Sequence, residues 1–159
     1  MTNEISIRLA KLGDAPRIAR MSRTLVEAGL PWTWTARRVA EHMKQRENLA
    51  VIAAAGGELA GFAMAQFGSQ RVHLALLCVA EHRRRQGLGR RLVHWVEETA
   101  VTAGLFELRL EVRESNRAAQ RFYASLGYKP SGAAALYYSG LENAIRYTRD
   151  LSCTASRDH

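Results

Sequence analysis

A run of arginines beside glycines is the stretch of this chain best suited to bind an anion. Arg83, Arg84 and Arg85 stand directly before Gly87-Leu88-Gly89. Glycines let the backbone approach a phosphate group closely, and arginine adds long-range attraction and forked hydrogen bonds. If a helix begins at this turn, its free N–H groups and its dipole strengthen the same site. We therefore expect a phosphate-bearing ligand here.

The residues on either side predict the elements that would position this turn. The preceding run, residues 74–80, is apolar on both faces, which is typical of a central strand covered on both sides. The following residues predict an amphipathic helix that ends at Gly104, because its apolar residues fall four apart. These residues are Leu88, Leu92, Val96 and Ala100.

Two nucleotide-binding motifs with this outline are absent from the sequence. A dinucleotide fingerprint would have glycine at position 92, which is Leu92, and a P-loop would have Gly-Lys followed by Ser or Thr. From the local residues alone, a tight turn followed by a solvated basic run stays open as an alternative.

A second stretch carries charged residues at strand spacing. Residues 106–113 alternate and predict a strand whose apolar face is formed by leucines and a valine. The pattern alone would assign the opposite face to solvated cross-strand ion pairs. That face carries Glu107, Arg109, Glu111 and Arg113.

The next predicted helix places two polar residues on one stripe. Ser115 or Asn116 can cap this helix, and Gly127 closes it. Asn116 and Tyr123 are two turns apart, so they span about 10 Å along one side. An extended ligand could lie along such a stripe.

Together these two stretches resemble the GCN5-related N-acetyltransferases, the GNAT superfamily. The run from Arg84 to Gly89 is similar to its acyl-CoA signature, which reads Arg/Gln, any, any, Gly, any, Gly/Ala. Leu110-Glu111-Val112-Arg113, with the block that follows to Tyr128, resembles the branch that acetylates the N-terminal alanine of a ribosomal protein. Glu81 departs from the pattern, because members often carry proline there, and this concerns turn geometry rather than chemistry.

The resemblance implies an α/β fold in a single GNAT-type domain, residues 1–151, followed by a frayed tail, residues 152–159. Its sheet would be central, mixed, mostly antiparallel and twisted, with about six or seven strands flanked by about four helices. Strands are expected over residues 5–9, 49–55, 58–67, 74–80, 106–113, 132–138 and 144–150. Helices are expected over 15–28, which Asp14 can cap, over 36–45, which Thr35 can cap, and in the two stretches above.

The resemblance also implies roles for individual residues, with acetyl-CoA as co-substrate. Glu111 would accept the proton of the amine, directly or through a water, and Tyr123 would protonate the leaving thiolate. Asn116 would contact the cofactor, and the backbone of Leu77, Cys78 and Val79 would pair with the pantetheine arm as a strand does. The pyrophosphate would be held mainly by backbone N–H groups of the stretch Arg85, Gln86, Gly87, Leu88, Gly89 and Arg90, and Arg84 is a further cofactor-binding candidate.

Aromatic residues stand where the resemblance places the acceptor. Trp32 and Trp34 lie in a loop that borders the substrate side in the acetyltransferases, but both can equally wedge this loop against the sheet. Tyr137 and Tyr138 resemble a tyrosine pair that faces the acceptor in relatives, and strand packing explains them as well. Of these, Trp34 and Tyr138 are the candidates for the substrate side.

Composition narrows the cellular setting and the partners. The chain has 159 residues and a net charge of +8, which suits one globular domain attracted to anions. The five histidines lack the spacing of metal ligands, so no metal is expected. The two cysteines, Cys78 and Cys153, do not suggest a disulfide framework, and Cys78 in the apolar strand is expected to be a buried, inert thiol. No apolar run or leader pattern favours a membrane or export, so we expect a cytoplasmic protein.

Three classes of function remain open on the sequence. The first is acetylation of the N-terminal amine of a protein, by direct transfer in a ternary complex. The second is acetylation of a small amine, such as an amino acid, a polyamine or an antibiotic, although the positive charge disfavours polycations. The third is a non-catalytic module that binds acyl-CoA or RNA, against which the pair Glu111 and Tyr123 speaks. The absence of RNA-reading motifs disfavours nucleic acid, and a homodimer stays open.

Overall fold

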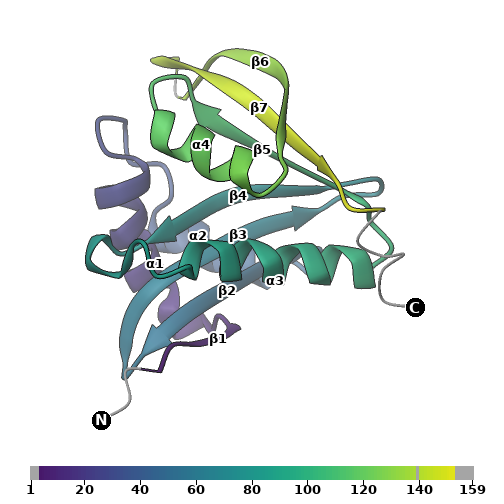
Figure 1. The fold of residues 1–159 in the computed structure, drawn as a ribbon. Helices are drawn as coiled ribbons and strands as arrows, with labels where there is room; N and C mark the ends of the chain where they lie inside the picture. Colours follow the sequence, from purple (N-terminus) through teal and green to yellow (C-terminus); the bar gives the residue numbers. More distant parts are fainter. Residues whose placement is uncertain (1–3, 139, 153–159) are drawn as a thin grey trace. The chain divides into compact units, whose positions relative to one another are not determined.

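A computed structural model of the protein describes residues 4–138 and 140–152 (Figure 1). The chain divides into two compact units, each of which has its own strands and helices. The first contains residues 1–67 and 74–96, and the second contains residues 68–73 and 97–159. Of the expected tail, residues 153–159 lie outside the described part, as does Cys153. None of the described helices has the length and the apolar character to cross a membrane.

In the first unit the strand order is β1-β2-β3-β4, and β1–β2 and β2–β3 are antiparallel pairs. Gly56 and Gly57 form the tight turn between β2 and β3 with φ of 56° and 89°, a conformation that glycine adopts without strain. The strands are β1 (Ser6–Leu9), β2 (Asn48–Ala55), β3 (Glu58–Phe67) and β4 (Val72–Val79), which enters this unit at Leu74.

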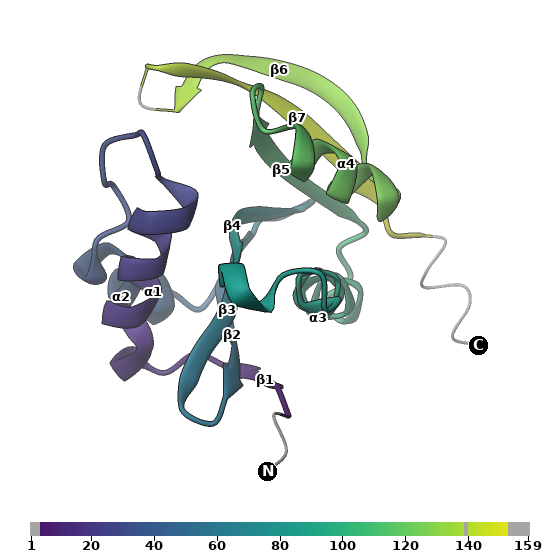
Figure 2. The ribbon, with the colours of Figure 1, turned by 60° about the vertical axis from the view of Figure 1, so that its left-hand side comes forward.

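Helices cover both faces of this sheet. Figure 2 shows α1 (Ala15–Met21) and α2 (Ala36–Lys44) on one side, and the start of α3 (Leu88–Thr102) on the other. Thr35 caps α2 as expected, because its side chain accepts a hydrogen bond from the Arg38 N–H. One apolar cluster joins α1 and α2 to the sheet; its buried residues are Ala15, Ile18, Ala19, Val39, Ala50, Ile52, Leu59, Phe62, Met64, Leu76 and Cys78.

The helix expected over residues 15–28 changes character after Met21. Residues Ser22–Val26 form a π-helix, in which the Glu27 N–H donates to the Ser22 carbonyl at 2.7 Å. The Ser22 hydroxyl also donates to the buried Glu27 carboxylate at 3.0 Å. Such wide turns occur often at functional sites, and this one leads into the loop that carries both tryptophans.

The predicted capping of α1 by the Asp14 side chain is wrong. Asp14 stands at the N-cap position, but its carboxylate accepts hydrogen bonds from the Lys11 N–H, Arg8 and Arg17 instead. Burial alone would raise the pKa of Asp14, but the hydrogen bonds from these three residues lower it to about 2. The hydrogen bonds from the two arginines take the place of the bond that Asp14 would accept as a helix cap.

Gly61 on β3 leaves no room for a side chain. A Cβ atom there would lie 2.7 Å from the Cys78 carbonyl oxygen and 3.2 Å from Leu92 Cδ1. Gly61→Ala is therefore expected to lower the free energy of unfolding by about 1–3 kcal/mol, measured by urea denaturation. In Gly13→Ala the new Cβ has no neighbour within 4 Å, so this control should change it by less than about 0.5 kcal/mol. Equal stabilities of the two variants would contradict the close approach.

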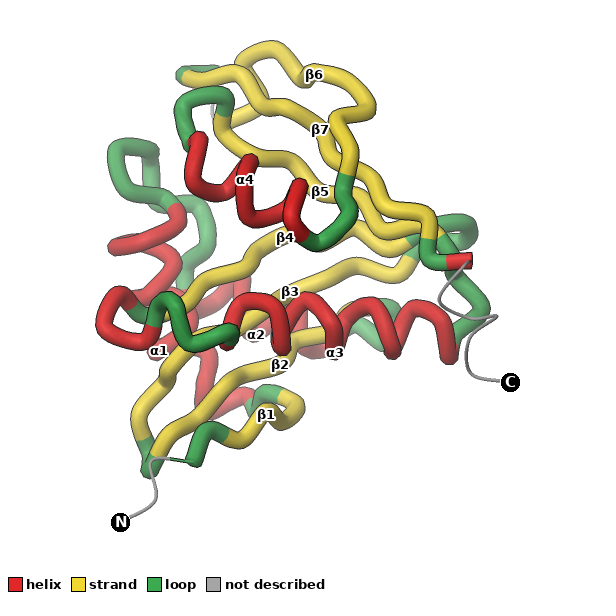
Figure 3. Tube along the Cα trace, in the orientation of Figure 1, coloured by secondary structure: helices red, strands yellow, loops and turns green. Residues whose placement is uncertain are grey.

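In the second unit the strand order is β4-β5-β7-β6, with β5 (Glu107–Arg113), β6 (Lys129–Tyr138) and β7 (Glu142–Asp150). β4 and β5 are parallel and pair at Val72–Leu108 and His73–Arg109. β5 and β7 are antiparallel along all of β5, and β6 adds antiparallel to β7. Figure 3 shows α4 (Arg117–Ser125) alongside β5.

A side-chain cap and two glycines define the ends of helices in this unit. The Asn116 side chain caps α4 by accepting from the Ala119 N–H at 3.1 Å. Gly104 and Gly127 terminate α3 and α4 in left-handed conformations, as the sequence predicts. The expected order of strands and helices is thus confirmed.

Two strands differ in extent or burial from the prediction. β4 begins at Val72 rather than at residue 74, and β6 at Lys129 rather than at residue 132. Full burial of β4 on both faces is also wrong, since its residues alternate between buried and half-buried. The residues of both faces are apolar, so the sequence could not show this difference.

Candidate functional site

The candidate residues fall into two groups, one in each unit. The first unit carries the arginine–glycine loop, the end of β4 and the tryptophan loop. The second unit carries Glu111, Asn116, Tyr123 and Tyr138.

The loop before α3 has the backbone shape of an anion-binding turn. After the 3-10 turn Glu81–Arg83, Arg85 has φ of 65° and Gly87 has φ of 75°. Such left-handed residues turn successive N–H groups toward one side of a loop. Buried Leu88 anchors the start of α3, and the Arg91 N–H donates to the Gly87 carbonyl as its first helical bond. The Arg84 N–H already donates to the Glu81 carbonyl at 3.3 Å, whereas the N–H groups of residues 85–90 precede the first helical bond and remain available to a ligand.

The charged side chains of this loop divide into two sets. His82 and Arg83 lie 2.5 Å and 3.6 Å from the Glu58 carboxylate, which offsets part of the charge of Arg83. Arg84, Arg85 and Arg90 are exposed, and Arg84 Nε donates to the Val79 carbonyl. Residues Arg84 to Arg90 therefore suit a phosphate group.

At the end of β4 the side chains alternate. Cys78 is buried in the apolar cluster, and burial raises the pKa of its thiol to about 12 despite the charge of Arg84. Leu77 and Val79 are half-buried. Cys78 is thus an inert thiol, as the sequence predicts.

The tryptophan loop is tied down by one buried carboxylate. Glu27 Oε1 accepts from the Thr33 N–H at 2.7 Å, the Thr33 hydroxyl at 2.6 Å and the Trp34 N–H at 3.2 Å. Trp34 packs against the apolar cluster and lies edge-on to His42. Trp32 is 38% exposed. The packing of Trp34 favours the wedge interpretation for that residue, whereas Trp32 is more exposed and has the Arg23 guanidinium 5.0 Å from its ring centre.

In the second unit Glu111 is held from both sides. His73 Nε2 lies 2.5 Å from Glu111 Oε2, and Arg146 Nε lies 3.4 Å from Oε1. The Glu111 side chain is only 7% exposed. The β5–β7 register places Arg146 directly opposite Glu111, and the β4–β5 register places His73 beside Arg109, two residues away. The cross-strand ion pair that the pattern alone indicates is present at position 111, but the Glu111 side chain is not solvated.

The electrostatics keep Glu111 ionised. Burial favours its neutral form, but the hydrogen bonds and charges of His73 and Arg146 outweigh burial and lower the pKa of Glu111 below its ordinary value. A carboxylate of this kind is a weak proton acceptor but a strong partner for an imidazole.

His73 and Arg146 were missed by the sequence analysis. His73 was one of five scattered histidines, and Arg146 was one residue of an expected strand. Only the strand registers bring them to Glu111, and no local spacing reports a register. Alternation along residues 142–150 could predict on which face of the strand Arg146 lies. It could not predict which residue of the neighbouring strand lies opposite Arg146.

Two tyrosines complete this group. The Tyr138 hydroxyl donates to the Glu111 carbonyl at 3.1 Å, and the Arg113 guanidinium lies 5.7 Å from its ring centre. Tyr123 is buried, and burial together with nearby Tyr138 raises its pKa far above the ordinary value. Tyr123 is therefore a neutral phenol. Asn116 is exposed, and its side-chain oxygen already serves as the cap of α4.

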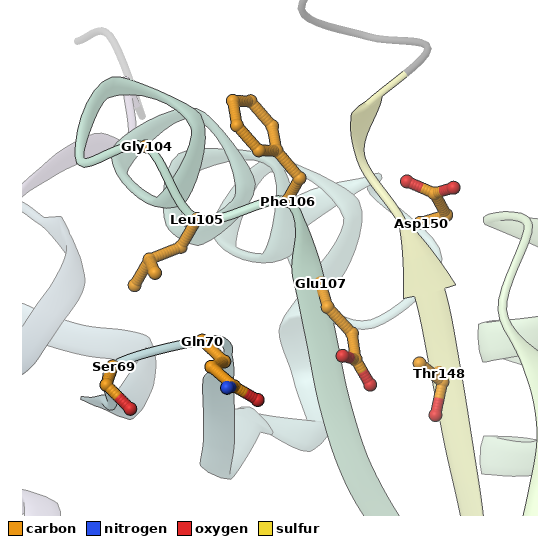
Figure 4. Close-up of a pocket in the computed structure, with 8 residues that line it drawn as sticks. All are labelled: Ser69, Gln70, Gly104, Leu105, Phe106, Glu107, Thr148 and Asp150. Atoms are coloured by element: carbon orange, nitrogen blue, oxygen red, sulfur yellow. The ribbon is translucent and has the colours of Figure 1, made fainter.

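Each unit also has a pocket away from these residues. In the second unit a pocket of about 570 Å³ lies at the other end of β5 and β7 from Glu111, and Figure 4 shows Gln70 and Glu107 among its side chains. In the first unit a pocket of about 430 Å³ opens beside Glu81 and His82, lined also by Arg17 and Arg20 of α1. Among the described residues no three His, Cys, Asp or Glu side chains form a possible metal site.

Residues 19–128 match the family described as the acetyltransferase (GNAT) family, so the chain belongs to that family and is an acetyltransferase.

Several relatives are N-terminal acetyltransferases by name. The chain is 28% identical to the N-alpha-acetyltransferase of Sulfurisphaera tokodaii over 154 residues, which are 89% of this chain and 90% of that protein. It is 37% identical to the ribosomal protein bS18-alanine N-acetyltransferase of Escherichia coli over 92 residues, 56% of this chain and 62% of that enzyme.

Solved structures share the fold. The crystal structure of the ribosomal-protein-S18-alanine N-acetyltransferase from Escherichia coli matches with a TM-score of 0.77 at 28% identity, covering 94% of this chain and 95% of that one. Ard1 from Thermoplasma volcanium matches with a TM-score of 0.82 at 23% identity, over 92% and 97% of the two chains. The GNAT fold expected from the sequence is thus confirmed.

Proposed function

We propose that this acetyltransferase moves the acetyl group of acetyl-CoA to the N-terminal amine of a protein. The observation that carries the proposal is the buried Glu111, bonded to His73 and Arg146 within a Leu-Glu-Val-Arg strand. The names of the bacterial and archaeal relatives support the same acceptor. An N-terminal amine has a reference pKa near 7.7–8.0, against about 10.4 for lysine, so it needs only modest help to lose its proton.

In this proposal Glu111 and His73 take up the proton together. The lowered pKa of Glu111 makes it a poor base alone, whereas an imidazole held by a carboxylate is a common general base near neutral pH. Because His73 Nε2 bonds Glu111, the other ring nitrogen, Nδ1, is the one that can accept a proton, directly or through a water. Glu111 fixes the ring and stabilises the charge that it gains.

Other residues hold the co-substrate and the leaving group. Acetyl-CoA supplies an activated thioester. The N–H groups of residues 85–90 fit its pyrophosphate, since Arg85 and Gly87 turn the backbone there and the Arg91 N–H makes the first helical bond. Leu77, Cys78 and Val79 would offer backbone groups to the pantetheine arm and to the developing oxyanion. Tyr123, a neutral phenol, would protonate the thiolate, and Trp34 and Tyr138 stay proposals for the acceptor side.

Direct transfer is expected to need no cysteine nucleophile. Because Cys78 is buried with a raised pKa, Cys78→Ala should retain kcat within about threefold of the unsubstituted protein. Intact mass spectrometry after incubation with acetyl-CoA alone should show no added acetyl group. An acetyl adduct on Cys78 would contradict direct transfer.

The acceptor class is tested by release of free CoA over a panel of acceptors. The panel contains peptides with a free N-terminus, the same peptides blocked at the N-terminus but bearing lysine, and small amines, with Glu111→Gln as the blank. Turnover confined to free N-termini supports the proposal. Turnover of small amines or of lysine only would overturn the acceptor and leave the acetyltransferase assignment intact.

A further inference from the structure

Arg146 has more hydrogen-bonding capacity than the protein uses. Its Nε faces Glu111 Oε1 at 3.4 Å, but its Nη1 and Nη2 make no hydrogen bond to any residue in 4–138 or 140–152. The side chain is 32% exposed, whereas Glu111 is 7% exposed. A guanidinium thus lies at the entrance to a buried carboxylate, with its outer fork still open.

The neighbouring strand leaves space beside this fork. Gly132 on β6 pairs with Arg146, and a Cβ on Gly132 would lie 3.8 Å from Arg146 Nη1. Since glycine has no side chain, the outer nitrogens border backbone rather than a competing group. The outer N–H groups of a planar guanidinium, on Nη1 and Nη2, match the two oxygens of a carboxylate in a bidentate geometry.

The charges around Glu111 disfavour an acceptor that carries only a positive charge. Arg146 and His73 bond the carboxylate itself, and Arg109 and Arg113 flank it along β5. The nearest acidic residue along the strand, Glu107, already lies 3.3 Å from Arg71 and 3.5 Å from Arg109. A substrate that brings its own negative charge would offset the repulsion between the arginines at positions 109, 113 and 146 and an ammonium group.

We propose that Arg146 selects acceptors that carry a carboxylate beside the reacting amine, namely N-termini with Asp or Glu as the first or second residue. This inference rests on the proposed function, because it names the substrate class of the same site. The carboxylate would bind Nη1 and Nη2 while the amine lies toward Glu111 and His73. Arg146 is thus a specificity-determining residue rather than a proton acceptor.

The test compares peptides identical except for Asp, Asn, Ala or Lys at residue 1 or 2. The expected kcat/KM is about tenfold higher for Asp than for its uncharged isostere Asn, as one charge-assisted hydrogen bond would give. In Arg146→Gln this ratio should fall below about twofold, and Arg146→Lys should keep part of it. Arg37→Gln, at an arginine that is 88% exposed in the first unit, is the control and should keep the full ratio.

The ratio of kcat/KM between the Asp and Asn peptides distinguishes selection of a carboxylate by Arg146 from a merely structural role of this residue. Loss of packing or of the Glu111 ion pair would slow the Asp and Asn peptides alike and leave their ratio unchanged. Equal kcat/KM for both peptides, or a ratio that survives in Arg146→Gln, would overturn the inference while the proposed function stands. If free aspartate were the best acceptor, the carboxylate would belong to a free amino acid. The assignment of a peptide N-terminus as the acceptor would then be overturned. Turnover of no N-terminus at all would overturn the proposed function and this inference with it.

Discussion

Glu111→Gln is expected to lower kcat on a peptide acceptor by about 100-fold or more, the usual range for general acid–base catalysis. The amide keeps the size of the side chain but removes the negative charge that bonds His73 and Arg146. Without that charge the imidazole is neither oriented nor stabilised when it gains a proton. Steady-state kinetics give kcat, and calorimetry should show an unchanged Kd for acetyl-CoA.

Glu107→Gln is the matched control for this variant. It removes a carboxylate from the same strand, four residues away, where the partners are Arg71 and Arg109. Its kcat should stay within about threefold of the unsubstituted protein, because the Glu107 carboxylate pairs with Arg71 and Arg109 and not with His73 or Arg146. Equal losses in the two variants would show that the charge of β5 as a whole, and not position 111, sets the rate.

Gly87→Glu is expected to raise the Kd for acetyl-CoA by about 30-fold or more. Gly87 has φ of 75°, where a side chain costs about 1–2 kcal/mol, and a carboxylate there would repel the phosphate groups. The space itself is open, since a Cβ at this position has no neighbour within 4 Å. Isothermal titration calorimetry measures the effect.

Two variants separate charge from strain and from general destabilisation. Gly87→Asn tolerates the left-handed conformation and adds no charge, so it should raise Kd by less than about threefold. Gly56→Glu puts the same residue at φ of 56°, also without neighbours, in the β2–β3 turn and should leave Kd unchanged. Wild-type affinity in Gly87→Glu would exclude this loop as the phosphate site.

Local patterns in the sequence were sufficient for most of the fold. The four-residue spacing of Leu88, Leu92 and Val96 predicts α3, and the Gly56-Gly57 pair predicts the β2–β3 turn. These features depend on neighbours a few residues apart. The π-helix at Ser22–Val26 was not predictable in this way, because it depends on a wide turn that a buried glutamate holds.

Only those residues of the candidate site that belong to a recognisable family motif could be predicted from the sequence. Glu111 and the loop from Arg84 to Gly89 stand in recognisable runs, whereas His73 and Arg146 become partners of Glu111 only through the pairing of β4, β5 and β7. Alternation assigned Glu111 to solvent because charged residues alternate with leucines there. The cost of burying its charge is offset by partners from other strands, which no pattern within one strand can show.

The hydrogen bonds that Glu27 accepts from Thr33 and Trp34 have a consequence for the thermodynamics of binding. Opening the tryptophan loop would leave the buried Glu27 carboxylate with Ser22 as its donor but without the hydrogen bonds from Thr33 and Trp34, so the loop loses its conformational entropy when the chain folds rather than when a ligand arrives. A ligand that touches Trp32 should therefore bind with a small entropic penalty from this loop. The N–H groups of Thr33 and Trp34 should accordingly exchange slowly with deuterated solvent, even though Trp32, directly before them, is exposed.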